Sequence, residues 1–122
     1  MANNSFGIAD VDWDRAKAEI REVLIKRAKV RGMIPYSELV TKVQAVAFHA
    51  YDQRLFRILG ELSVEEATAG RGMLSAIVVH KVGDMEPGPG FFKLGAELGR
   101  DTSDQTKCWV DEIKLLYSTW SK

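Results

Sequence analysis

Residues 32–39 read GMIPYSEL, and this stretch decides how the first half of the chain is arranged. Gly32 follows a helical pattern and is a natural stop for it, because glycine readily adopts the backbone conformation that closes a helix. Residues 33–36 are short and apolar, and Pro35 limits them to an extended segment at the edge of a sheet. Residues 37–43 then have the spacing of a short helix. The stretch therefore predicts a helix, one edge strand and a second helix in succession.

A long amphipathic helix is expected before this stretch, over residues 13–30. Apolar residues recur there at helical spacing, as Trp13, Ala16, Ile20, Val23, Leu24 and Ala28. Acidic residues gather at its beginning and basic residues at its end, an order that complements the helix dipole. Asp10 or Asp12 is the expected N-cap. Residues 1–10 form a loose arm before a single domain over residues 11–122.

A further helix is expected over residues 53–62, with Asp52 as its N-cap. The pattern Ser63-Val64-Glu65-Glu66 is a capping box, which predicts that a separate short helix begins at Ser63. Gly70 ends that short helix. Residues 74–79 contain a run of β-branched residues and are the expected strand.

Residues 82–90 are expected to form a loop, because prolines and glycines alternate over residues 87–90. A helix follows over residues 91–98. The last helix has Thr102 or Ser103 as its expected N-cap and carries an apolar stripe of Trp109, Ile113, Leu116, Tyr117 and Trp120.

A buried strand needs a partner for its backbone groups. We expect one of two segments to lie beside the strand over residues 74–79, either residues 33–36 or residues near Phe91. The predicted fold is therefore α+β and mostly helical, with a small two- or three-stranded sheet and an extra C-terminal helix.

The chain has 122 residues with 17 basic and 17 acidic side chains, so its formal net charge is zero. This balance excludes a protein that binds nucleic acid by bulk charge, but it leaves room for a local basic face. The single cysteine, Cys108, permits no internal disulfide. No stretch approaches the roughly 18 apolar residues of a transmembrane helix, and the first residues lack the pattern of a signal peptide. We therefore expect a cytoplasmic protein without a membrane partner.

The order of elements from residue 13 to about residue 94 resembles that of winged helix-turn-helix domains. In that family a helix and a short strand precede two helices, the second of which enters the major groove of DNA, and a β-hairpin forms the wing. Residues 32–39 look like the G-x-(I/V)-x-Y-x-x-L entrance common to many such domains. A closer parallel is the DNA-binding domain of alkylguanine-DNA alkyltransferases and their alkyltransferase-like relatives. The resemblance implies a winged-helix-like fold and DNA binding.

The segment Ala76-Ile77-Val78-Val79-His80-Lys81 departs from that family. Alkyltransferases carry Pro-Cys-His-Arg at this place, whereas this chain has no cysteine there, so the nucleophile of alkyl transfer is absent. The alkyltransferase-like proteins also keep most of that motif. Farther along, Pro87-Gly88-Pro89-Gly90-Phe91-Phe92 and the strand before it are similar to a strand–PGxGFF segment of small bacterial proteins, and that similarity implies no activity.

The first functional hypothesis is a non-enzymatic bacterial domain that binds duplex DNA through a helix-turn-helix face. Basic and polar side chains of types that contact phosphates and base edges occur on the first and third expected helices and after the strand. The predicted nucleic-acid-binding residues are Lys26, Arg27, Lys29, Arg31, Gln53, Arg54, Arg57, His80 and Lys81. The basic cluster also fits a solvated helix end, and the loop over residues 82–90 fits a wing, a binding loop or a stiff surface loop.

The second hypothesis is a protein-interaction or accessory module, or a homodimer, that uses the aromatic C-terminal helix. Its predicted interface is Phe91, Phe92, Trp109, Tyr117 and Trp120, which alternatively pack in the core of the domain itself. The third hypothesis is a small enzyme with His80 as general base, although no set of nucleophile, base and orienting residue can be assembled. The separations of His49, His80 and Cys108 match no zinc spacing. We expect no metal and no cofactor.

Overall fold

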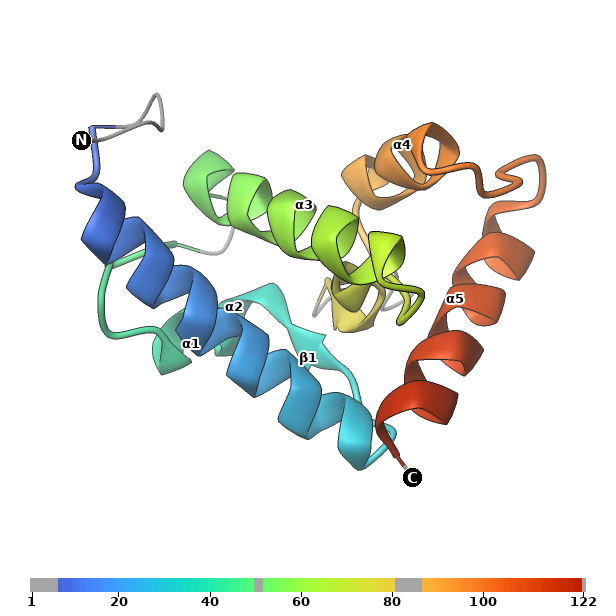
Figure 1. The fold of residues 1–122 in the computed structure, drawn as a ribbon, viewed down its shortest axis with the longest axis horizontal. Helices are drawn as coiled ribbons and strands as arrows, with labels where there is room; N and C mark the ends of the chain where they lie inside the picture. Colours follow the sequence, from blue (N-terminus) through green and yellow to red (C-terminus); the bar gives the residue numbers. More distant parts are fainter. Residues whose placement is uncertain (1–6, 50–51, 81–86, 122) are drawn as a thin grey trace.

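The computed structural model describes residues 7–49, 52–80 and 87–121. This part of the chain is mostly helical, with five α-helices, two short 3-10 helices and one small sheet (Figure 1). The elements in chain order are α1 (Asp10–Lys29), β1 (Ile34–Pro35), α2 (Tyr36–Leu39), η1 (Val40–Lys42), α3 (Gln53–Thr68), η2 (Leu74–Ile77), β2 (Val78–Val79), α4 (Pro89–Glu97) and α5 (Gln105–Trp120).

Helices α1 and α3 run in the same direction and lie side by side (Figure 1). Trp13 Nε1 donates a hydrogen bond of 3.0 Å to Glu61 Oε1, and Arg21 lies 3.4 Å from the buried carboxylate of Glu66 farther along both helices. Lys17 forms ion pairs with Glu61 and Glu65 between these two points. These contacts align the start of α1 with the middle of α3.

The sheet has two parallel strands, with Ile34 opposite Val78 and Pro35 opposite Val79. The expectation that residues 33–36 lie beside the later strand is therefore confirmed. The expected strand over residues 74–79 is shorter than predicted, because η2 occupies residues 74–77 and only Val78 and Val79 are extended.

Helix α3 continues through the predicted break at Ser63, so the separate short helix expected there is wrong. Ser63 is fully buried and its hydroxyl donates a 2.7 Å hydrogen bond to Ser75 Oγ, a tertiary contact that a local capping pattern does not reveal. The opposite end of α3 is as expected: Asp52 is its N-cap and accepts a hydrogen bond from the Arg54 amide.

Two other helix starts differ from the expectation. Helix α1 begins at Asp10, so Asp10 and Asp12 lie in its first turn and neither caps it. The negative charges of these two carboxylates still interact favourably with the positive end of the helix dipole. Helix α5 begins at Gln105, and its N-cap is Asp104, whose carboxylate accepts from the Lys107 amide, rather than Thr102 or Ser103. Ser103 instead binds Asp101.

Helix α5 closes the remaining side of the core with its apolar stripe. Trp109 Nε1 donates a 2.8 Å hydrogen bond to the Ala76 carbonyl, and the Tyr117 hydroxyl donates one of 3.0 Å to the Gly32 carbonyl. Glu112 is buried and accepts hydrogen bonds from the Met73 amide and from the Arg100 guanidinium. This carboxylate therefore ties α5 to the segments that precede η2 and α5.

Candidate functional site

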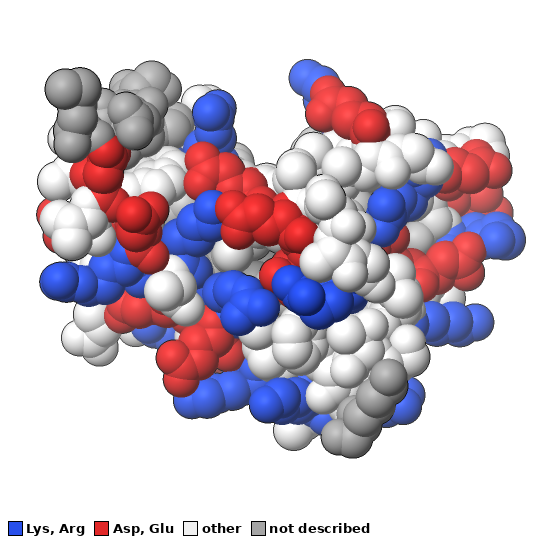
Figure 2. Space-filling view, in the orientation of Figure 1, with Lys and Arg blue, Asp and Glu red and all other residues white. Residues whose placement is uncertain are grey.

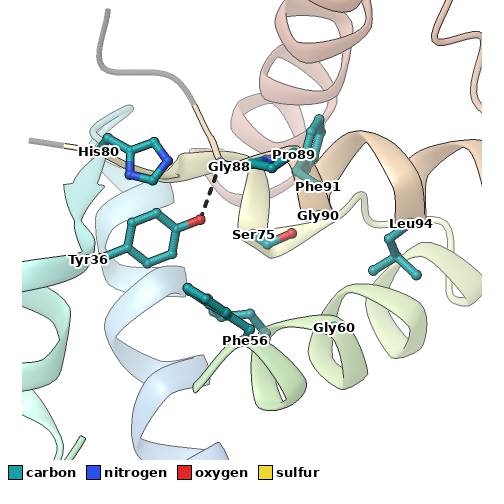
Figure 3. A pocket seen from close by; sticks show the side chains of 11 residues that line it. Tyr36, Phe56, Gly60, Ser75, His80, Gly88, Pro89, Gly90, Phe91 and Leu94 are labelled. Carbon is teal, nitrogen blue, oxygen red and sulfur yellow. Dashed lines mark hydrogen bonds between the residues drawn. The ribbon is translucent and has the colours of Figure 1, made fainter. Parts of the chain in front are cut away.

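An apolar pocket of about 400 Å³ lies between α3 and α4 (Figure 3). Its walls come from several elements of the chain, between residue 36 and residue 94. The lining residues are Tyr36, Phe56, Leu59, Gly60, Ser75, His80, Gly88, Pro89, Gly90, Phe91 and Leu94. The volume falls within the roughly 300–1,000 Å³ of ordinary ligand pockets.

Aromatic rings form one side of this pocket. The Tyr36 ring meets the Phe56 ring edge-on, with centroids 5.7 Å apart, and packs tilted against the His80 imidazole at 5.2 Å. Phe91 also lines the pocket, and its buried ring meets the Phe92 ring edge-on. Such rings present flat apolar faces that favour a flat apolar ligand.

Glycines keep the pocket open on its other sides. A Cβ atom at Gly60, in the middle of α3, would meet only Leu94 Cδ2 at 4.0 Å, and one at Gly90 would meet nothing within 4 Å. The Gly88 amide donates a 3.4 Å hydrogen bond to the Tyr36 hydroxyl, drawn as the dashed line in Figure 3. This bond joins the start of α4 to the start of α2 across the pocket.

The pocket reaches the outer surface of α3 through Phe56, whose side chain is 40% exposed. Phe56, Gly60, Gly90 and Leu94 also line an adjoining, more open groove along α3. Charged residues rim that groove, namely Lys17, Arg57, Glu61 and Glu65. A molecule lying along the groove is therefore in position to place a group in the pocket.

Of the predicted nucleic-acid-binding residues, His80 lies at the pocket (Figure 3). The described residues do not include Lys81 or residues 82–86 of the predicted loop. Gln53 and Arg57 are exposed on the first turns of α3, and Arg57 is 3.4 Å from Glu61. The Arg54 guanidinium binds the Asp52 carboxylate at 2.6 Å and the Ala47 carbonyl at 2.9 Å. Arg54 therefore braces the start of α3.

The basic residues at the end of α1 lie at the other end of the paired helices. Arg27 binds Glu38 at 2.7 Å and the Met33 carbonyl at 2.8 Å, and Lys26 pairs with Glu22. Lys29 and Arg31 are exposed. Because an α-helix rises about 1.5 Å per residue, this cluster is roughly 30 Å from Arg57 along the helix pair. On the face shown in Figure 2, blue basic side chains are interspersed with red acidic ones.

The predicted partner-interface residues make internal contacts. Trp109 and Tyr117 direct their polar atoms to backbone carbonyls of Ala76 and Gly32, and Phe91 is buried. Phe92 and Trp120 are partly buried against the same core. These contacts match the alternative in which the aromatic residues pack in the domain's own core.

Phe56, Gly60 and Ser75 are pocket residues that the sequence pattern did not single out, and Tyr36 was noted only as the tyrosine of the motif over residues 32–39. Gly60 carried the one usable signal, because glycine inside a helix lowers its stability and often has a packing or functional reason. Among the described residues that line the pocket there is no aspartate or glutamate.

Comparisons of the chain with protein-family models, with curated proteins and with solved structures find no match. Within the described ranges, no helix combines the length and apolarity needed to cross a bilayer.

Proposed function

We propose that this chain is a non-enzymatic, winged-helix-like domain that binds DNA along α3 and holds one unstacked base in the pocket between α3 and α4. The observation that carries the proposal is the position of the pocket. Phe56 and Gly60 line both the pocket and the surface groove of α3. A nucleic acid bound along α3, as helix-turn-helix domains bind it, would therefore lie over the opening of the pocket.

The order of elements supports the winged-helix part of the proposal. A helix, α1, precedes the strand β1, and α2 with η1 forms the first helix of the helix-turn-helix unit. Helix α3 is the second, and its exposed first turns carry Gln53 and Arg57, side-chain types that bind base edges and phosphates. We assign the role of the wing to residues 87–90, because Gly88, Pro89 and Gly90 line the pocket together with Phe56 and Gly60 of α3, although Pro89 and Gly90 already belong to α4.

The shape and chemistry of the pocket support a nucleobase as its occupant. Enzymes and binding proteins that take a base out of the stack hold it in a close pocket between aromatic or apolar side chains. Stacking of one base on an aromatic side chain contributes about 1–3 kcal/mol. Tyr36, Phe56, His80 and Phe91 offer such faces around this pocket.

The charge distribution predicts modest affinity with a limited dependence on salt. Arg57 is exposed near the pocket, but Glu61 and Glu65 lie on the same groove. Lys26, Lys29 and Arg31 are about 30 Å away along the helix pair, so they contact phosphates only on a duplex that extends along the molecule. Each phosphate contact steepens the salt dependence of binding.

The other two hypotheses receive less support. For an enzyme centred on His80, the described residues that line the pocket offer no combination of nucleophile, base and orienting group that specifically favours it. A partner-binding role for α5 needs exposed aromatic side chains, whereas Trp109 and Tyr117 bind backbone atoms of the same chain.

Fluorescence anisotropy with a labelled 20-base-pair duplex tests the proposal. We expect binding at 50 mM salt that weakens at 200 mM, and a several-fold loss in Arg57→Ala. Asp111→Ala, on the exposed side of α5, is the control and should bind as the unaltered chain does. Absence of binding by folded protein at 50 mM salt would overturn the proposal.

A further inference from the structure

We infer that Ser75 is a specificity-determining residue of the pocket, and that its hydroxyl selects a flat heteroaromatic ring with a hydrogen-bond acceptor over a hydrocarbon ring of the same shape. The inference rests on the proposed role of the pocket as a ligand site. It adds the chemical class of the ring and the residue that recognises it.

The hydrogen bonds around Ser75 leave one donor unused. Ser75 is 8% exposed, and its backbone amide donates a 3.1 Å hydrogen bond to Ser63 Oγ. The Ser63 hydroxyl in turn donates its proton to Ser75 Oγ at 2.7 Å. The two hydroxyls carry two protons but share one hydrogen bond, and the hydrogen bonds of the described residues include no other acceptor for either proton. With Ser63 as the donor, the unused proton is that of Ser75.

The position of Ser75 directs this unused donor to the pocket. Ser75 is the first-turn residue of η2 that lines the pocket, and in Figure 3 its side chain lies at the centre of the view, between Tyr36 and Leu94. Ser63, the other member of the pair, is fully buried in α3 and does not line the pocket. The hydrogen bonds to Ser63 therefore fix the position of Ser75 Oγ from the side away from the pocket.

A buried donor without an acceptor is destabilising, because it has lost its hydrogen bond to water and gained none in return. A ligand that places a ring nitrogen or a carbonyl oxygen beside the Ser75 hydroxyl accepts its hydrogen bond. A hydrocarbon ring in the same position excludes water from the hydroxyl and accepts no hydrogen bond. Sites built to hydrogen-bond a ligand reject analogues that lack the matching group. Every nucleobase carries such an acceptor.

Two probe molecules of matched shape separate the hydrogen bond from the apolar contact. Quinoline has a ring nitrogen that accepts a hydrogen bond, and naphthalene has the same two fused rings without an acceptor. Each is titrated into the ¹⁵N-labelled full chain at neutral pH, and the amide shifts of Gly60, Ser75 and Gly90 report binding in the pocket. Neither titration involves DNA.

We expect Ser75→Ala to weaken quinoline binding by about 5- to 10-fold, the effect of one neutral hydrogen bond, and to change naphthalene binding by less than twofold. Ser75→Cys, which replaces the hydroxyl with a weak thiol donor, should fall between the two for quinoline. It also serves as the second variant if the alanine variant does not fold.

An equal loss for both probes, no loss for quinoline, or no binding of either probe would overturn the inference. The DNA titration above is independent of this result. Loss of DNA binding with the quinoline effect intact would reject the proposed function alone and leave Ser75 as the recognition residue for a small heteroaromatic ligand.

Discussion

Gly60 has an unusual position, because it lies in the middle of the 16-residue helix α3 and nothing in its surroundings requires a glycine. A Cβ atom there would lie 4.0 Å from Leu94 Cδ2, which is ordinary van der Waals contact. Glycine in a helix interior costs about 0.8–1.0 kcal/mol relative to alanine. We therefore expect Gly60→Ala to raise the free energy of unfolding by about 1 kcal/mol.

Urea denaturation followed by circular dichroism measures this gain. With a slope of about 2 kcal/mol per molar urea, the midpoint should rise by about 0.5 M. The melting temperature should rise by about 3–5 °C, as expected for a domain of this size. The same substitution at Gly72 should act in the opposite direction. Gly72 has a φ of 94°, and its Cβ would lie 3.3 Å from the Leu115 side chain.

The reasoning is refuted if Gly60→Ala is neutral or destabilising, or if Gly72→Ala is as stabilising as Gly60→Ala. A confirmed gain has a functional consequence, because it shows that the chain keeps a glycine at a stability cost where a side chain would enter the pocket. This is the result expected if the pocket takes a ligand.

Three further predictions concern the charged and polar braces of the fold. The Arg54 guanidinium holds the pKa of Asp52 at about 2, below its ordinary 3.8. The ionised Asp52 carboxylate therefore stabilises the fold fully above pH 4, and this stabilisation is lost as the pH falls toward 2. Asp52→Ala should cost about 1–2 kcal/mol at pH 7 and little at pH 2, measured by urea denaturation; an equal cost at both pH values would contradict the assignment. Glu112→Ala should cost about 3 kcal/mol, because it leaves the Met73 amide and Arg100 without their acceptor, whereas Asp111→Ala, with its exposed pair to Lys107, should cost less than 0.5 kcal/mol. Tyr117→Phe should cost about 1 kcal/mol through loss of the bond to the Gly32 carbonyl, and light scattering should show its oligomeric state unchanged, whereas a changed state would favour the interface hypothesis for α5.

The features that the sequence pattern predicts well are those set by neighbouring residues. The N-cap at Asp52 is one, because its carboxylate binds the Arg54 amide two residues away. The pairing of residues 33–36 with the later strand is another, since the requirement for a backbone partner left few candidates.

The misread features are those where a tertiary contact overrides a local pattern. Ser63 has the sequence of a helix N-cap, yet its hydroxyl binds Ser75 and the helix continues. The same contact helps to explain the shortened strand, because the Ser75 amide donates to Ser63 Oγ instead of to a neighbouring strand.

The sequence pattern alone does not predict the pocket. Its walls come from α2, α3, η2, the end of β2 and the start of α4, and no periodicity joins these positions. The distance between Arg57 and the basic cluster at the end of α1 was likewise not predictable from the sequence pattern. Periodicity places Arg57 and the Lys26–Arg31 cluster on helices, whereas the contacts of Trp13, Lys17 and Arg21 with α3 fix which ends of the helices meet.

The most direct test of the central claim is a comparison of two duplexes that differ in a single unpaired base. We expect the unaltered chain to bind the duplex with the unpaired base at least fivefold more tightly than the fully paired one. Gly60→Leu, which places a side chain in the pocket, should abolish that preference and retain salt-dependent binding to paired DNA. Thr68→Leu, exposed at the end of α3, should keep the preference. Equal affinity of the unaltered chain for the two duplexes, or a preference that survives in Gly60→Leu, would contradict the account.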